Sequence, residues 1–130
     1  MVTTITSFST LRHIPLGDGM SEHDQQTAVV QYCDLMCIPV FAIPNGGKRS
    51  KREAARFKEE GVRAGVPDLF IPVARGGYHG FFLEMKDVNG RPPRPNQREW
   101  LNRLDAQGYC TAWAAGADTA IKQIQCYMSL

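Results

Sequence analysis

The sequence has no long hydrophobic run. Nothing in its 130 residues approaches the roughly 18 consecutive apolar residues that a membrane-spanning helix needs. The first residues also lack the basic and apolar regions of a secretory signal peptide. At 43% hydrophobic and 22% charged residues, the composition is that of one globular domain with a single core. We therefore expect a cytoplasmic protein that makes no use of a membrane.

Closely spaced cysteine pairs are also missing. The four cysteines, Cys33, Cys37, Cys110 and Cys126, form no CxxC motif. Cys33 and Cys37 have helical spacing and could in principle begin a zinc site with His23, but reduced, partly buried thiols are the expected state. No histidine lies in a plausible constellation with a serine or cysteine, which excludes nucleophilic catalysis of the Ser-His-Asp or Cys-His type.

A large excess of charge of one sign is the third absence. The formal net charge is +2, so any affinity for nucleic acid must come from local clusters of basic residues. The segment 48–63 is one such cluster, because seven of its residues are basic and three are acidic. Such a run is usually a solvated helix face, and the alternative is contact with phosphates, which makes binding salt-dependent.

What the chain does contain is charge inside an apolar hairpin. Two short aromatic-rich runs, 67–73 and 80–86, are separated by a Gly-Gly turn, which predicts a β-hairpin. Because side chains alternate along a strand, Glu84 and Lys86 share one face, and Asp68 stands at the start of the partner strand. Burying such charges is costly unless they are paired or neutralised by a metal. The pattern therefore predicts a site for a divalent cation and a phosphodiester.

The remaining periodicities complete a regular order of elements. Helices are predicted over 21–36, 48–61, 95–106 and 118–127, and strands over 38–43, 67–73, 80–86 and 109–114. The order α-β-α-β-β-α-β-α predicts an α/β fold with a mixed sheet flanked by helices. Residues 1–20 have no sustained period and are expected to form an N-terminal arm before the domain at 21–130.

Polar residues interrupt two of the helical stripes. At 100° per residue, Glu22 and Gln26 continue the apolar stripe that includes Val29, although an acid in a first helical turn is ordinarily explained by the helix dipole. Gln97 shares the inner face of its helix with Trp100, as either a satisfied core amide or a site residue. The residues alone leave both questions open.

Taken together, these motifs resemble the VRR-NUC (virus-type replication-repair nuclease) branch of the PD-(D/E)XK nuclease superfamily. In chain order, the matching motifs are Glu22 and Gln26, Pro44-Asn45-Gly46-Gly47, Gly65 to Leu69, Glu84-Met85-Lys86, and Pro95 to Leu101 with Gly108. The resemblance implies a restriction-endonuclease-like core, in which the basic segment 48–63 is an inserted helix.

The resemblance also implies the residues of a metal-dependent deoxyribonuclease. The implied catalytic residues are Glu22, Asp68, Glu84, Lys86 and Gln97. Of these, Asp68 and Glu84, with the backbone carbonyl of Met85, would bind Mg²⁺ or a substituting Mn²⁺, and Glu22 would join them directly or through water. The residues expected to bind DNA are Lys48, Arg49, Lys51, Arg52, Arg91 and Arg94.

The function implied is that of a structure-selective endonuclease of phage or bacterial origin. Because one small domain carries one site, cutting a Holliday junction calls for two sites, which a homodimer supplies; the N-terminal arm and the last helix are the expected interface. Two alternatives are a non-catalytic DNA-binding or interaction domain with this fold, and a restriction-type endonuclease. Loss of an acid or the lysine would favour the first, and added base-reading segments the second.

Overall fold

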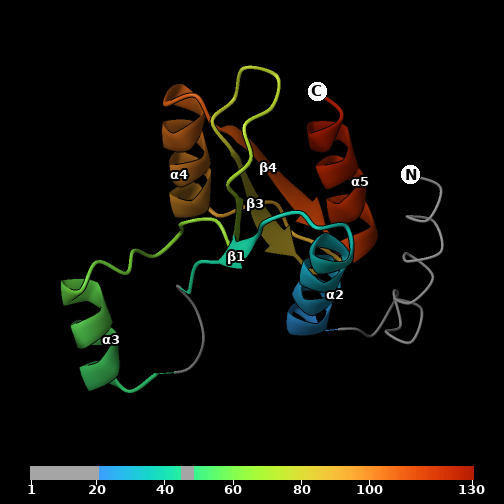
Figure 1. Cartoon of the computed structure of the whole chain (residues 1–130). Helices are drawn as coiled ribbons and strands as arrows, with labels where there is room; N and C mark the ends of the chain where they lie inside the picture. Colours follow the sequence, from blue (N-terminus) through green and yellow to red (C-terminus); the bar gives the residue numbers. More distant parts are fainter. Residues whose placement is uncertain (1–20, 45–48) are drawn as a thin grey trace.

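A four-stranded mixed sheet forms the centre of the molecule (Figure 1). The computed structural model describes residues 21–44 and 49–130, so the predicted arm at 1–20 lies outside the described residues. In spatial order, the strands are β1 (Phe41–Ala42), β2 (Leu69–Ile71), β3 (Phe81–Lys86) and β4 (Cys110–Ala115). The first three strands pair antiparallel, and β3 pairs parallel with β4.

Helices cover both faces of this sheet. They are α2 (Glu22–Leu35), α3 (Lys51–Glu59), α4 (Pro95–Ala106) and α5 (Ala117–Met128). In Figure 1, α2 and α5 lie together on one side of the sheet and α4 lies on the other. The predicted α/β class and element order are therefore confirmed. None of the helices in the described part of the chain is long and apolar enough to cross a membrane.

The alternation of β3 decides which face of the sheet becomes the core. Phe81, Leu83 and Met85 are 2%, 0% and 0% exposed and belong to one buried cluster with apolar side chains of α2 and α5. Burying a side chain of this size contributes about 1.5–3 kcal/mol. The opposite face of β3 carries Glu84 and Lys86, so the predicted division of the strand into an apolar and a charged face is confirmed.

The first strand is shorter than the prediction of 38–43. Cys37 has a positive φ of 57°, and the N–H of Ile38 donates to the Cys33 carbonyl at 2.8 Å, so these residues close α2 instead of entering the sheet. Pro39 has no N–H to donate to a ladder. Pairing therefore begins only at Phe41.

The basic segment forms α3, between β1 and β2, and none of its residues is buried. Its first turn is held by a reciprocal capping box, in which Glu53 N–H donates to Ser50 Oγ at 3.1 Å and Ser50 N–H donates to the Glu53 carboxylate at 3.2 Å. Figure 1 shows α3 standing apart from the sheet. The inserted basic helix is confirmed, over fewer residues than the predicted 48–61.

Candidate active site

The end of β3 holds an ion pair that the sheet buries. Glu84 is only 3% exposed, and its Oε2 lies 3.7 Å from Lys86 Nζ. Both side chains project from the same face of the strand, on the side of α4. A carboxylate in this position is costly to bury, because one ammonium group at 3.7 Å replaces only part of its hydration.

Helix α4 brings Gln97 between these two charges. Its Nε2 donates to Glu84 Oε2 at 3.0 Å, and its Oε1 accepts from Lys86 Nζ at 2.7 Å. The same oxygen accepts from the backbone N–H of Arg94 at 2.8 Å, which fixes the amide at the start of α4. Because both ends of the amide are engaged, Gln97 holds Glu84 and Lys86 in one arrangement. The amide therefore contacts both predicted site residues of β3, and its part in catalysis stays a prediction.

The hairpin register places Asp68 opposite Glu84. Leu69 pairs with Leu83, so Asp68 stands one step further along the same antiparallel ladder. Its Oδ2 accepts a hydrogen bond of 2.7 Å from the backbone N–H of Met85. That bond orients the Asp68 carboxylate toward the end of β3, where Glu84 lies. No contact of the Met85 carbonyl is among the bonds described for the site, and its role as a metal ligand stays a prediction.

The two carboxyl groups perturb each other. Burial, followed by the charge of Asp68, raises the pKa of Glu84 to about 8, against the opposing effect of Lys86. Burial also raises the pKa of Asp68, against the bond from Met85 and the charge of Lys86. Two carboxyl groups this close in a desolvated place resist being ionised together. The pair is therefore electrostatically short of positive charge.

This donor set fits Mg²⁺ better than a cation that needs a complete protein cage. Within 21–44 and 49–130, no group of three or more His, Cys, Asp or Glu side chains is placed to hold a metal. Mg²⁺ is usually bound by one or two carboxylates together with water and substrate phosphates. Asp68 and Glu84 supply such a pair. Direct participation of Glu22 in the same ligand set has no support in this geometry, and its role through water stays a prediction.

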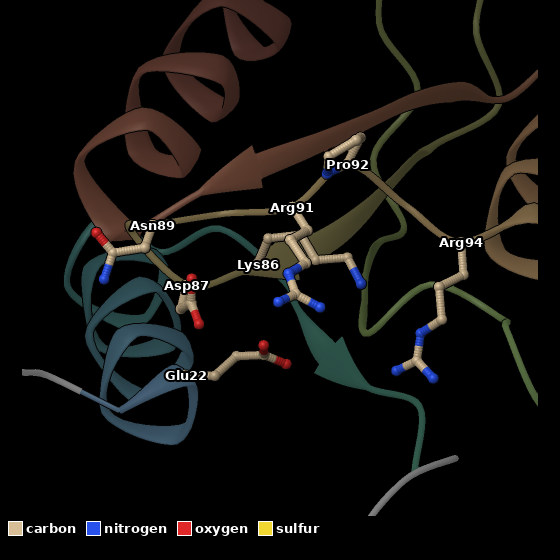
Figure 2. Close-up of a pocket in the computed structure, with 7 residues that line it drawn as sticks. All are labelled: Glu22, Lys86, Asp87, Asn89, Arg91, Pro92 and Arg94. Atoms are coloured by element: carbon tan, nitrogen blue, oxygen red, sulfur yellow. The ribbon is translucent and has the colours of Figure 1, made fainter.

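A pocket of about 620 Å³ opens at Lys86, the last residue of β3 (Figure 2). Its lining residues are Glu22, Lys86, Asp87, Asn89, Arg91, Pro92 and Arg94. Figure 2 shows the Glu22 carboxylate and the Arg91 guanidinium directed into the same space. Burial, and then the charge of Asp68, raises the pKa of Glu22, while Lys86 and Arg94 lower it. Thus α2 brings Glu22 within the field of the site, and the loop before α4 supplies its cations.

The predicted DNA-binding residues fall into two groups. Arg91 and Arg94 border the pocket. Lys51 and Arg52 are exposed on α3, and the guanidinium of Arg49 lies 4.2 Å from the centre of the Phe57 ring, where it stabilises the helix locally. Lys48, the remaining residue of this set, lies outside the described residues. The structure therefore gives two separated basic surfaces, one at the pocket and one on α3.

Sequence reasoning chose Gln26 as the neighbour of Glu22, and the buried residue is Gln25. Gln25 is 1% exposed, and its Oε1 accepts from the Ala117 N–H at 2.7 Å. Helix α5 begins after Gly116, which has no side chain to cap it. This missing cap is the signal that could have pointed to an acceptor elsewhere in the chain. Gln25 ties α2, and with it Glu22, to α5.

The comparison with known families decides the assignment. The model of the VRR-NUC domain matches residues 41–118, which include the carboxylate pair, Lys86 and Gln97. The chain belongs to the VRR-NUC domain family. A solved structure described as "VRR_NUC domain protein" is 34% identical, covers 88% of this chain and 93% of its own, and superposes with a TM-score of 0.74. A search of curated proteins returns no match. The PD-(D/E)XK assignment of the fold is consistent with this family.

The VRR-NUC match begins after α2. Glu22 lies outside residues 41–118, so its place in the site rests on the geometry of this chain: it lines the pocket and feels the charge of Asp68. Asp68, just before β2, and Glu84 of β3 lie within the matched residues, and their catalytic role stays a prediction.

Replacing Gln97 by alanine should lower the rate of the DNA cleavage that the family resemblance implies by about 10- to 100-fold, as expected when an orienting partner of a predicted metal ligand is lost. Glu84 and Lys86 would then lose the amide that holds both. Single-turnover kinetics at saturating Mg²⁺ measures this loss. Asn102→Ala, at an exposed position of the same helix, serves as the control, and equal rates for the two variants would contradict the orienting role.

Proposed function

We propose that this VRR-NUC protein is a Mg²⁺-dependent endonuclease that hydrolyses phosphodiester bonds in DNA. The observation that carries the proposal is the pair formed by half-buried Asp68 and buried Glu84, with Gln97 bonded to both Glu84 and Lys86. Buried like charges destabilise a fold and are found where function needs them. A divalent cation held by Asp68 and Glu84 would remove their repulsion and would supply positive charge to a bound DNA phosphate.

In this mechanism, Asp68 and Glu84 would hold the cation. Bound there, Mg²⁺ would supply Lewis-acid stabilisation of the phosphate and lower the pKa of water. Lys86 presents its ammonium group on the same side of β3, held by Gln97 Oε1 at 2.7 Å, and stabilises negative charge as the phosphate is attacked. Arg91 and Arg94 bind phosphates beside the scissile one. Glu22 orients water at the pocket wall.

The substrate we propose is branched DNA, with the four-way junction preferred. One site cuts one strand in a single engagement, and symmetric cutting of a junction needs two sites in fixed geometry. A twofold homodimer is the simplest way to supply them. We place this reaction in the interior of a bacterial cell, in the service of the bacterium or of a phage.

The test is incubation of the pure protein with linear, flap and four-way DNA, with and without Mg²⁺. Cleavage should need the cation and be fastest on the junction. Light scattering should give twice the 14.5 kDa of one chain. A strict monomer that nicks linear duplex as fast as a junction would remove the junction and dimer proposals and leave the nuclease. DNA binding without cleavage of any substrate would instead favour a non-catalytic binding domain.

Replacing Lys51 and Arg52 together by alanine should weaken DNA binding at low salt. Both side chains are exposed on a helix that buries nothing, which suits phosphate contact better than packing. The slope of log affinity against log salt should fall by about one for each lost contact. Lys122→Ala, at an exposed position of α5 on the opposite face of the sheet, is the matched control. An unchanged slope in the double variant would reduce α3 to a solvated helix.

A further inference from the structure

Aromatic rings form a continuous row across three strands. Phe41 pairs with Phe70, and Phe70 pairs with Phe82, so the three side chains lie in register on one face of the sheet. The ring centres of Phe41 and Phe70 are 5.4 Å apart at 73°, and those of Phe70 and Phe82 are 4.3 Å apart and stacked. Tyr109 contacts Phe82 edge-on at 5.2 Å.

This row stands next to the carboxylate pair. Phe82 is two residues before Glu84 and Phe70 is two residues after Asp68, and residues two apart on a strand share a face. With a rise of about 3.3 Å per residue, the row runs roughly 7 Å from the two acids. It is therefore an apolar surface close to the proposed site, in addition to Trp113, which pairs with Glu84 from β4 and is 37% exposed.

The aromatic row is not fully buried, unlike the side chains of the hydrophobic core. None of its rings belongs to the buried cluster beneath α2 and α5. Its exposed end is Phe41, which at 53% exposed is the most exposed aromatic side chain in the described part of the chain. Leaving a ring in water forgoes about 1.5–3 kcal/mol of burial. A row that served only as packing under α4 would not end in this way.

The edge-to-face contact also leaves Phe41 ready to bind. Phe70 supports the ring at 73°, so the contact fixes the orientation of Phe41 while half of its surface stays in water. β1 is an edge strand, and the chain that follows it leads to basic α3. Phe41 pairs with Phe70, two residues after Asp68, and aromatic rings combined with basic residues are typical of single-strand binding surfaces.

We propose that Phe41 is a stacking platform for an unpaired base of the DNA bound at the Asp68–Glu84 site. The proposal rests on the proposed function and adds a substrate class to it: DNA in which a base near the cut phosphate is free of its own stack. Every base has a π-face, so this contact selects structure and tolerates any sequence. Paired duplex keeps its bases inside and gains nothing from Phe41.

The test measures binding without divalent cation, so that nothing is cut. Fluorescence anisotropy compares a single strand, a duplex with unpaired bases and a fully paired duplex. Phe41→Leu keeps an apolar contact with Phe70 but has no ring, and it should bind the first two about 10-fold more weakly and the paired duplex equally well. Phe41→Trp should restore binding. Tyr78→Ala removes another exposed ring, one in the hairpin turn remote from the acids, and should change nothing.

Three results would overturn the proposal. Equal affinity of Phe41→Leu and the native protein for unpaired DNA removes the stacking role. Equal losses on paired and unpaired DNA make the effect a general one. If Phe41→Leu instead changes the mass measured by light scattering, Phe41 belongs to an interface between copies. If the native protein cuts no DNA but Phe41→Leu still weakens binding to unpaired DNA, only the proposed nuclease function is refuted. If the native protein cuts junctions and Phe41→Leu binds unpaired DNA as well as the native protein does, only the stacking role is refuted.

Discussion

Each single replacement of Asp68, Glu84 or Lys86 should abolish DNA cleavage and leave the fold intact. The conservative changes Asp68→Asn, Glu84→Gln and Lys86→Met keep the size of each side chain. Asp68→Asn also keeps an oxygen that can accept the hydrogen bond from the Met85 N–H. Each removes a charge that acts on the cation or the phosphate, so the rate should fall by about 100- to 1,000-fold or more. Alanine at the same positions should have the same effect.

The defect should be in turnover, because phosphate contacts by other basic residues supply most of the binding. DNA affinity measured without Mg²⁺ should therefore stay near the native value, because Glu84, with a pKa of about 8, is already largely protonated near neutral pH and Asp68→Asn removes no positive charge. Glu99→Gln, at an exposed position of α4, is the control and should cut normally. Native-like cleavage by any of the three site variants would sink the assignment of the site.

Much of the fold could be predicted because its signals are local. Side-chain alternation along β3 separates Phe81, Leu83 and Met85 from Glu84 and Lys86, and this predicts which face is buried. Pro95 opens α4 at the predicted residue. The start of the first strand was predicted wrongly, because Pro39 and the apolar residues around it do not reveal that the N–H of Ile38 donates to the Cys33 carbonyl and closes α2.

The site residues likewise include some that the local sequence pattern predicts and others that it does not. Asp68, Glu84 and Lys86 follow from strand periodicity and the hairpin, since register and alternation bring them together. Gln97 could be chosen only through the family resemblance, because a glutamine on an apolar stripe is equally consistent with a core amide. Gln25 was missed because neighbouring helix positions differ by 100°, and only the packing of α5 selects between them.

In the metal-free protein, stability should fall as the pH rises toward about 8. Glu84 has a pKa of about 8 in the fold and an ordinary value of 4.5, so between these pH values the folded state binds more protons than the unfolded state. Its contribution to the free energy of unfolding is complete below pH 4.5 and is lost as the pH passes through about 8. Denaturant unfolding across this range measures the decline. Glu84→Gln should flatten it, and Glu99→Gln should leave it unchanged.

Adding Mg²⁺ should reverse the trend. Mg²⁺ binding requires Glu84 to be ionised, so binding releases a proton. Below the pKa of Glu84, the affinity for Mg²⁺ should therefore increase by up to about tenfold for each unit that the pH rises. The stabilisation by a fixed Mg²⁺ concentration should therefore grow from acidic to alkaline pH, and titration calorimetry in buffers of different ionisation enthalpy should detect the released proton. Glu84→Gln has no proton to release and should gain no stability from Mg²⁺. If Mg²⁺ stabilised the native protein equally at every pH, or stabilised this variant as well, the cation would bind somewhere other than the Asp68–Glu84 pair.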